Sequence, residues 1–246
     1  MIKKSDNPDW RLQAVAEVAQ ANSALWVSAG DMMIAVSQFP LKDTPVTFFL
    51  PNMTAIFLEY SNNSFCGTKE YFVYKNFERD KNWRIVKDHD NFFNILQQRL
   101  SSIIFAFLAL ETFMNDSIPD DYTFDNTHKQ CRTAKSSPNN LDKDYIMEKI
   151  SVGDKFLFIL ADIFQLIEIK QDIKDKFYEL KDLRDRITHL KPEDKKSSDL
   201  SQDTLWKVIL SKDLPNYALI TKEIIGYFLS GIPIDKQPRW FKLINF

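Results

Sequence analysis

Glycine is scarce in this chain, with 5 among 246 residues. This scarcity argues against three architectures that depend on glycine: the phosphate-cradling loop, the dinucleotide-binding fingerprint and the β-propeller repeat. Cys66 and Cys131 are the only cysteines, and their wide separation argues against a zinc site or a disulfide framework. Two reduced thiols in a cytosolic protein are the simpler expectation. We therefore expect no metal site and no cofactor.

Long hydrophobic runs and an excess of charge of one sign are also missing. The longest apolar run, residues 103–110, is far shorter than the roughly 20 residues that a membrane-spanning helix needs. The first residues are polar rather than an apolar signal core, so we expect a cytoplasmic protein with no membrane partner. A net charge of −2 gives no general attraction for nucleic acid, and any RNA must bind a local basic patch.

The chain is instead rich in phenylalanine and in helical periodicity. Twenty phenylalanines indicate a core filled by aromatic rings. Apolar side chains recur at steps of three and four residues in several segments, which predicts helices over residues 9–36, 51–60, 89–118, 141–150, 156–167, 171–190, 203–210 and 215–229. There is no internal repeat and no alternation of strands with helices. The sequence therefore predicts an all-α protein, an antiparallel bundle of about four main helices with an additional N-terminal helical portion.

The expected domain organisation places a boundary near residue 88. Residues 1–88 form a mostly helical portion of unknown role, in which residues 70–74 and 82–86 fit either a strand or a helix. Residues 89–246 contain the bundle, and residues 120–140 are a polar connection within it.

The most informative segment is the charged helix end before Pro192. Arg184, Asp185 and His189 lie there, and Asp185 and His189 are one helical turn apart, so the carboxylate can orient the imidazole and favour its charged form. A guanidinium fork beside an imidazole is suited to a phosphodiester. The alternative interpretation is a solvated helix face held by ion pairs such as Lys181–Asp185.

This segment resembles the HEPN family, the α-helical domains named for higher-eukaryote and prokaryote nucleotide binding. Arg184 to His189 matches the family's Arg-x4-His motif with a favoured residue after the arginine, at the end of the third helix of the expected bundle. The helix over residues 105–115 is similar to the family's first helix, with Glu111 and a downstream Asn115. The resemblance covers roughly residues 90–231.

The resemblance implies a metal-independent endoribonuclease that works as a homodimer, in which two copies of the motif meet at one cleft. His189 would move protons, Arg184 would stabilise charge on the phosphoryl oxygens, and Asp185 would orient or polarise. The products would be a 2′,3′-cyclic phosphate and a 5′-hydroxyl. Glu111 and Asn115 would position the catalytic pair, although they also fit a polar helix edge.

Nearby cations would hold the flanking RNA backbone, and these are Lys181, Arg186, Lys191, Lys195 and Lys196. By analogy, such a protein is a toxin or a phage-defence effector restrained by an antitoxin or another regulatory protein. The alternative is a non-catalytic HEPN-like domain that binds a nucleotide or a protein partner. We expect the other histidines, His89 and His128, to be solvated surface groups.

Overall fold

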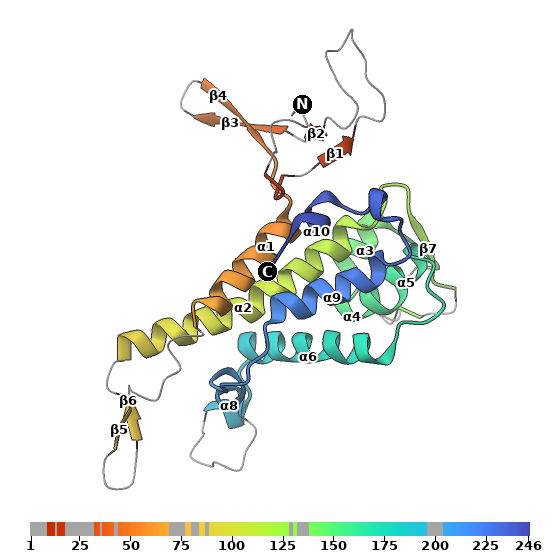
Figure 1. The fold of residues 1–246 in the computed structure, drawn as a ribbon. Helices are drawn as coiled ribbons and strands as arrows, with labels where there is room; N and C mark the ends of the chain where they lie inside the picture. The colour runs from red at the N-terminus through yellow and green to blue at the C-terminus, as the bar shows by residue number, and fades with distance from the viewer. Residues whose placement is uncertain are drawn as a thin grey trace. The chain divides into compact units, whose positions relative to one another are not determined.

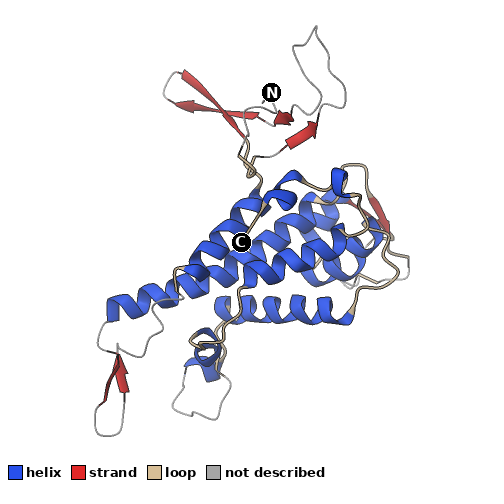
Figure 2. Ribbon diagram, viewed as in Figure 1, coloured by secondary structure: helices blue, strands red, loops and turns tan. Residues whose placement is uncertain are grey.

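The structure is a computed structural model that describes residues 9–12, 14–17, 32–34, 36–41, 44–68, 77–79, 84–86, 89–127, 130–131, 138–195 and 204–246. The chain divides into two compact units, residues 57–231 and residues 1–56 with 232–246. The described residues are mostly helical, as the blue ribbons of Figure 2 show, and their strands form small two-stranded sheets. The prediction of a mainly helical protein is confirmed at this level.

Three long helices form the core of the unit at residues 57–231. The central helix is α2 (His89–Asp116), which contacts α6 (Gln171–Thr188) and α9 (Tyr217–Leu229), and these two also contact each other. Each buries an apolar stripe with helical spacing, since a helix hides one face when it packs on its neighbours.

A fourth helical segment completes this core. It consists of α4 (Val152–Asp154), the π-helical turn η4 (Lys155–Ile159) and α5 (Leu160–Ile163). Phe156 of η4 is fully buried, and its ring stacks on Phe177 of α6 at a centroid distance of 3.9 Å. Phe228 of α9 meets the same ring edge-on at 5.5 Å. The expected aromatic core is therefore present.

Helices α2 and α6 run antiparallel (Figure 1). Arg184 lies over the ring of Phe107, whereas Phe177, two turns earlier on α6, stacks on Phe156. The neighbouring Lys155 is bonded to Asn115, two turns after Phe107 on α2. The last turn of α6 consequently lies beside the middle of α2.

Two further helices are tied to α2. The part of α1 (Met53–Cys66) that follows Ile56 contacts it, with Ser61 Oγ donating to the Ser102 carbonyl at 2.7 Å. The buried Arg99 donates to the carbonyls of Ile209 and Ser211 at 2.7 and 2.6 Å, at the end of α8 (Leu205–Ile209). Because α1 packs on α2 in this way, the units divide after residue 56, and not near residue 88 as expected.

The connection over residues 119–142 contains a small sheet. Strands β7 (Thr123–Asp125) and β8 (Asn140–Asp142) pair antiparallel before α3 (Lys143–Lys149). Asp142 caps α3, because its side chain accepts from the Tyr145 N–H at 2.8 Å. Also within residues 57–231, β5 (Phe77–Arg79) pairs with β6 (Arg84–Val86), and α7 (Pro192–Lys195) follows α6.

The described residues of the other unit are not mainly helical, and this part of the prediction is wrong. Strand β1 (Ala14–Glu17) pairs with β2 (Met32–Ile34), and β3 (Val36–Leu41) forms a hairpin with β4 (Thr44–Phe49). Small apolar residues gave a helix-like spacing, but β-branched and aromatic residues at 44–49 favour a strand. The C-terminal part of this unit holds η5 (Ile234–Lys236) and α10 (Arg239–Leu243).

Within the part of the chain that the structure describes, α2 is the one helix with the length and hydropathy to cross a membrane. It is nevertheless a packed helix of the core, with the buried, hydrogen-bonded Arg99 near its middle. A single helix of this kind is weak evidence for membrane insertion, because the core helix of a globular domain has the same composition.

Candidate functional site

The candidate site lies where α6 ends. Leu180 and Leu183 bury one face of this helix, and the last helical residue is Thr188. The chain leaves the helix at His189, with φ −132° and ψ 73°, three residues before Pro192, a residue that is common shortly after a helix because it cannot continue one. The His189 N–H still donates to the Asp185 carbonyl at 2.8 Å. This ending leaves the His189 residue exposed to solvent beside the final turn.

The guanidinium of Arg184 is held in place by an aromatic ring. Its central carbon lies 4.1 Å from the ring centroid of Phe107, a cation–π contact that fixes one face of the group. Its Nη1 atom is 3.0 Å from Oδ1 of Asp185, and the side chain is 27% exposed. Within the described structure its Nε is buried without a hydrogen-bond partner. Arg184 is thus oriented by the protein while part of it remains open to solvent.

Asp185 is paired with cations rather than with the histidine. Its Oδ2 atom is 2.6 Å from Nζ of Lys181, and its Oδ1 contacts Arg184. The Lys181–Asp185 ion pair named in the alternative interpretation is therefore formed. No hydrogen bond joins Asp185 to the His189 imidazole in the described residues, because His189 has already left the helical path. The expected orientation of the imidazole by this carboxylate is thus not made in the single chain.

Arg186 belongs to a buried ion pair. Its Nη2 atom is 2.8 Å from Oδ1 of Asp194, and the two side chains are 11% and 0% exposed. Burial acts to raise the pKa of Asp194, but hydrogen bonds from the Leu205 N–H and from Arg186 outweigh it and hold that pKa below its ordinary value. The interaction fixes α7 and α8 against the end of α6. Arg186 therefore has a structural partner inside the protein and is no longer among the residues that we expect to bind RNA.

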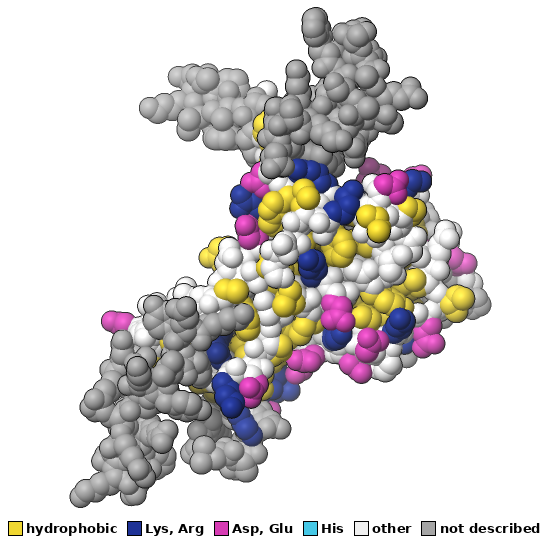
Figure 3. All heavy atoms as spheres, in the orientation of Figure 1, with side chains coloured by type: hydrophobic (Ala, Val, Ile, Leu, Met, Phe, Trp, Pro, Cys, Tyr) yellow, Lys and Arg dark blue, Asp and Glu magenta, His cyan; other side chains and the backbone are white. Residues whose placement is uncertain are grey.

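The other expected RNA-binding lysines are distributed around the helix end. Lys191 and Lys195 are exposed in the segment that follows His189, and Lys181 is half-buried in its ion pair. Lys196 lies outside the described residues. On the face drawn in Figure 3, acidic and basic side chains of the described residues are interspersed.

Glu111 and Asn115 face a different partner, the buried Lys155. The Lys155 ammonium donates to Asn115 Oδ1 at 2.9 Å and to the Met147 carbonyl at 3.0 Å. Burial lowers the pKa of Lys155, and the nearby carboxylate of Glu111 acts in the opposite direction. The expectation that Asn115 positions Arg184 or His189 is corrected, because its amide oxygen accepts a hydrogen bond from Lys155 at the other end of the core.

Two of these contacts had no clear signal in the sequence. Lys155 directly precedes the apolar run 156–160, which is an unusual position for a lysine and hints at burial. Phe107 belongs to the apolar stripe of α2, and only the packing of α6 shows that it supports Arg184.

Among the described residues, the other histidine and the acids add no further site. His89 is exposed at the first residue of α2, and His128 lies outside the described residues. In the described ranges, no group of three or more His, Cys, Asp or Glu side chains is arranged to hold a metal ion.

Comparisons with protein-family models, with curated proteins and with solved structures found no match to this chain. Any functional proposal therefore depends on the residues themselves.

Proposed function

We propose that this chain is a metal-independent endoribonuclease of the HEPN type that acts as a homodimer. The observation that carries the proposal is the exposed His189 at the end of α6, five residues after an Arg184 guanidinium already oriented by Phe107. An accessible imidazole and a fixed guanidinium at the same helix end provide a proton carrier and an anion-stabilising group.

The proposed reaction is transesterification within RNA. One His189 takes the proton of a 2′-hydroxyl, whose oxygen attacks the adjacent phosphorus. A bond from phosphorus to the 2′-oxygen forms as the bond to the 5′-oxygen breaks, and a second imidazole donates a proton to that leaving oxygen. Arg184 stabilises the negative charge that gathers on the phosphoryl oxygens. The products are a 2′,3′-cyclic phosphate and a 5′-hydroxyl.

Asp185 has a modified role in this proposal. Its carboxylate lies between Lys181 and Arg184, so it sets the position of Arg184 and not that of His189. Two cations around one carboxylate leave a net positive charge, which attracts a phosphate. Lys191 and Lys195 extend this local charge along the segment after His189.

The two-imidazole reaction requires a second copy of the chain, because each chain supplies one His189. By the same analogy we propose a cytoplasmic toxin or defence effector whose RNA cleavage is restrained by an antitoxin or another regulatory protein.

The direct test is incubation of the purified chain with total RNA in EDTA, followed by analysis of the product ends. We expect 2′,3′-cyclic phosphates and 5′-hydroxyls, and loss of cleavage in His189→Ala and in Arg184→Ala. Lys212→Ala is a matched control, because it removes an exposed cation elsewhere on the same unit. Products with 3′-hydroxyl ends, or cleavage that survives in both site variants, would contradict the proposal.

A second candidate function is supported by the ion pair between Arg184 and Asp185. Since Asp185 already pairs with this guanidinium, the site also suits a non-catalytic HEPN-like domain that binds a nucleotide or protein partner. Binding that depends on Arg184 but not on His189, without RNA cleavage, would favour this alternative.

A further inference from the structure

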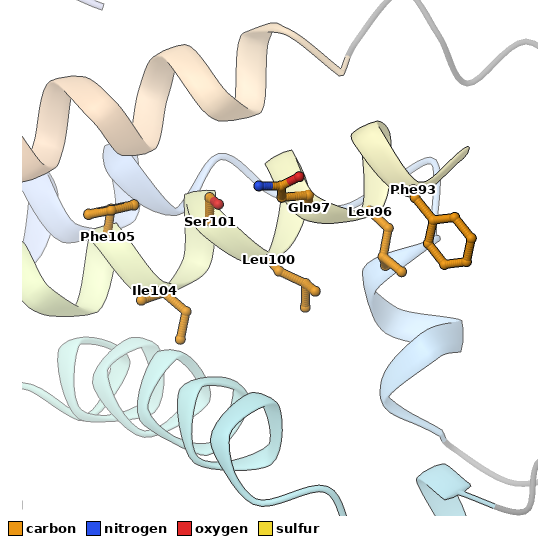
Figure 4. A pocket seen from close by; sticks show the side chains of 7 residues that line it. All are labelled: Phe93, Leu96, Gln97, Leu100, Ser101, Ile104 and Phe105. Atoms are coloured by element: carbon orange, nitrogen blue, oxygen red, sulfur yellow. The ribbon is translucent and has the colours of Figure 1, made fainter. Parts of the chain in front are cut away.

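One face of helix α2 is apolar and open. A pocket of about 410 Å³ on this face is lined by α2 side chains alone (Figure 4). Its apolar members are Phe93, Leu96, Leu100, Ile104 and Phe105, and Phe93 is 59% exposed. An apolar face that stays open to water is unfavourable, and it is typical of an interaction site.

Aromatic rings stand at both ends of this pocket, Phe93 at one end and Phe105 at the other (Figure 4). Tyr60 of α1 is 54% exposed, and its ring lies against that of Phe105 at a centroid distance of 4.4 Å. At the start of α2, the exposed His89 lies beside Phe93, with 6.5 Å between the ring centroids. Exposed flat rings of this kind can stack on any nucleobase, because every base has a π face.

Two polar side chains lie between these rings. Gln97 and Ser101 line the same pocket one turn apart, and in Figure 4 both lie on the side of α2 that faces α1. Gln97 is exposed and Ser101 is half-buried. An amide and a hydroxyl can donate to and accept from the polar edges of bases, whereas a purely apolar partner offers them no hydrogen bond.

The charge around this face suits a polyanion. Helix α2 carries no aspartate or glutamate over residues 91–110, and no carboxylate lines the pocket. The Arg184 guanidinium covers the ring of Phe107, one turn after Ile104, and the exposed Lys191 follows the end of the same helix α6. Cations at the edge of an aromatic face without acids are the combination that binds single-stranded nucleic acid.

We propose that this face of α2 binds the bases of single-stranded RNA beside the phosphate that Arg184 holds. Bases stack on Phe93 and Tyr60, and Gln97 and Ser101 form hydrogen bonds with base edges. The inference rests on the proposed function and names the form of its substrate. Bases in a duplex stack on one another, so they are not free to stack on these rings.

The length of the face sets the number of nucleotides that it can hold. From Phe93 to Phe107, helix α2 rises by roughly 21 Å at about 1.5 Å per residue. At a stacked spacing of about 3.4 Å, this rise corresponds to about six nucleotides. A probe of about twelve nucleotides therefore covers the face and extends past Arg184.

The first test measures the affinity of the full chain for such a single-stranded RNA by fluorescence anisotropy. All 2′-hydroxyls of the probe are methylated, so that it lacks the attacking group of the proposed reaction. We expect Phe93→Ala and Tyr60→Ala each to weaken binding at least about fivefold, because each removes one stacking ring. The control is Tyr178→Ala, which removes a ring of α6 that is 45% exposed and outside the pocket, and it should change the affinity less than about twofold.

Circular dichroism checks that the three variants are folded. Absence of binding by the wild type, or an equal loss of affinity in the control variant, would overturn the inference.

The second test separates the bases from the phosphates. An abasic strand of the same length keeps the phosphates but has nothing to stack, so the wild type should bind it at least about fivefold more weakly. Phe93→Ala should bind the abasic strand as tightly as the wild type does. If this substitution weakens binding to both strands by the same factor, the ring does not stack on bases and the inference is wrong.

Sedimentation of the same proteins distinguishes RNA from a protein occupant. Phe93→Ala should leave the oligomeric state of the wild type unchanged. Dissociation of an oligomer by this substitution would show that a second copy covers the face, which would overturn the inference.

The outcomes also separate this inference from the nuclease proposal, because the methylated probe cannot undergo the proposed reaction. Binding that depends on Phe93, without cleavage of ordinary RNA, supports the base-stacking face and contradicts the nuclease. RNA cleavage whose KM is unchanged in Phe93→Ala and Tyr60→Ala supports the nuclease and overturns the base-stacking face.

Discussion

Replacement of Asp194 by alanine should destabilise the helical unit strongly. The carboxylate is 0% exposed and accepts from Arg186 at 2.8 Å and from the Leu205 N–H at 2.5 Å. Its loss leaves the Arg186 charge buried without this partner, which typically costs about 3–5 kcal/mol, and removes the acceptor of a buried N–H, which costs about 1–3 kcal/mol. Because the two penalties overlap when the arginine relaxes, we expect a loss of about 4 kcal/mol in the free energy of unfolding.

The measurement is urea unfolding followed by circular dichroism, with the Trp206 indole N–H resonance as a local probe. That N–H donates to the Asp194 carbonyl at 2.7 Å, so its chemical shift reports whether α7 and α8 remain in place. The control is Glu168→Gln, which breaks an exposed ion pair with Lys174 and should cost less than about 1 kcal/mol. A loss below about 1 kcal/mol in Asp194→Ala would refute the reasoning.

The same contact predicts a dependence on pH. The pKa of Asp194 is lower in the folded chain than the value of about 3.9 of an unfolded aspartate. Between the folded and the unfolded pKa values, the unfolded state therefore binds more protons than the folded state. The stabilisation that Asp194 provides at neutral pH is lost as the pH falls through the folded pKa. Asp194→Asn should lack this portion of the acid destabilisation, and a parallel decline with pH in the two proteins would be inconsistent with it.

Three other predictions follow from buried or exposed side chains. Phe156→Ala should lower the free energy of unfolding by about 3–5 kcal/mol in urea, because the ring is fully buried against Phe177 and Phe228; a loss under about 1 kcal/mol would contradict the described core. Burial lowers the pKa of Lys155 in the folded state, so the free energy of unfolding of the wild type should rise with pH until about 10.4, the ordinary lysine pKa. In urea titrations at several pH values, Lys155→Met should lack that rise. His189→Ala should change stability by less than about 0.5 kcal/mol, since the residue is exposed, yet reduce RNA cleavage at least about a hundredfold in a gel assay; a large loss of stability would assign it a structural role instead.

The helical core was predictable from the sequence because its signals are local. The wide apolar stripe of α2 and the end of α6 before Pro192 depend on helical spacing and on the geometry of proline, which act within a few residues. The N-terminal strands β1 and β2 were missed because short runs of alanine, valine and methionine fit a helix or a strand equally well, and the pairing partner decides between them.

The site could be predicted only in part for a related reason. Its position at the end of α6 follows from sequence spacing, but the partners of its charges depend on packing between helices. Arg186 and Lys181 are both cations beside the motif, yet Arg186 faces the buried Asp194 and Lys181 faces Asp185. Likewise, Asn115 binds a lysine 40 residues away, a contact that no local pattern reveals.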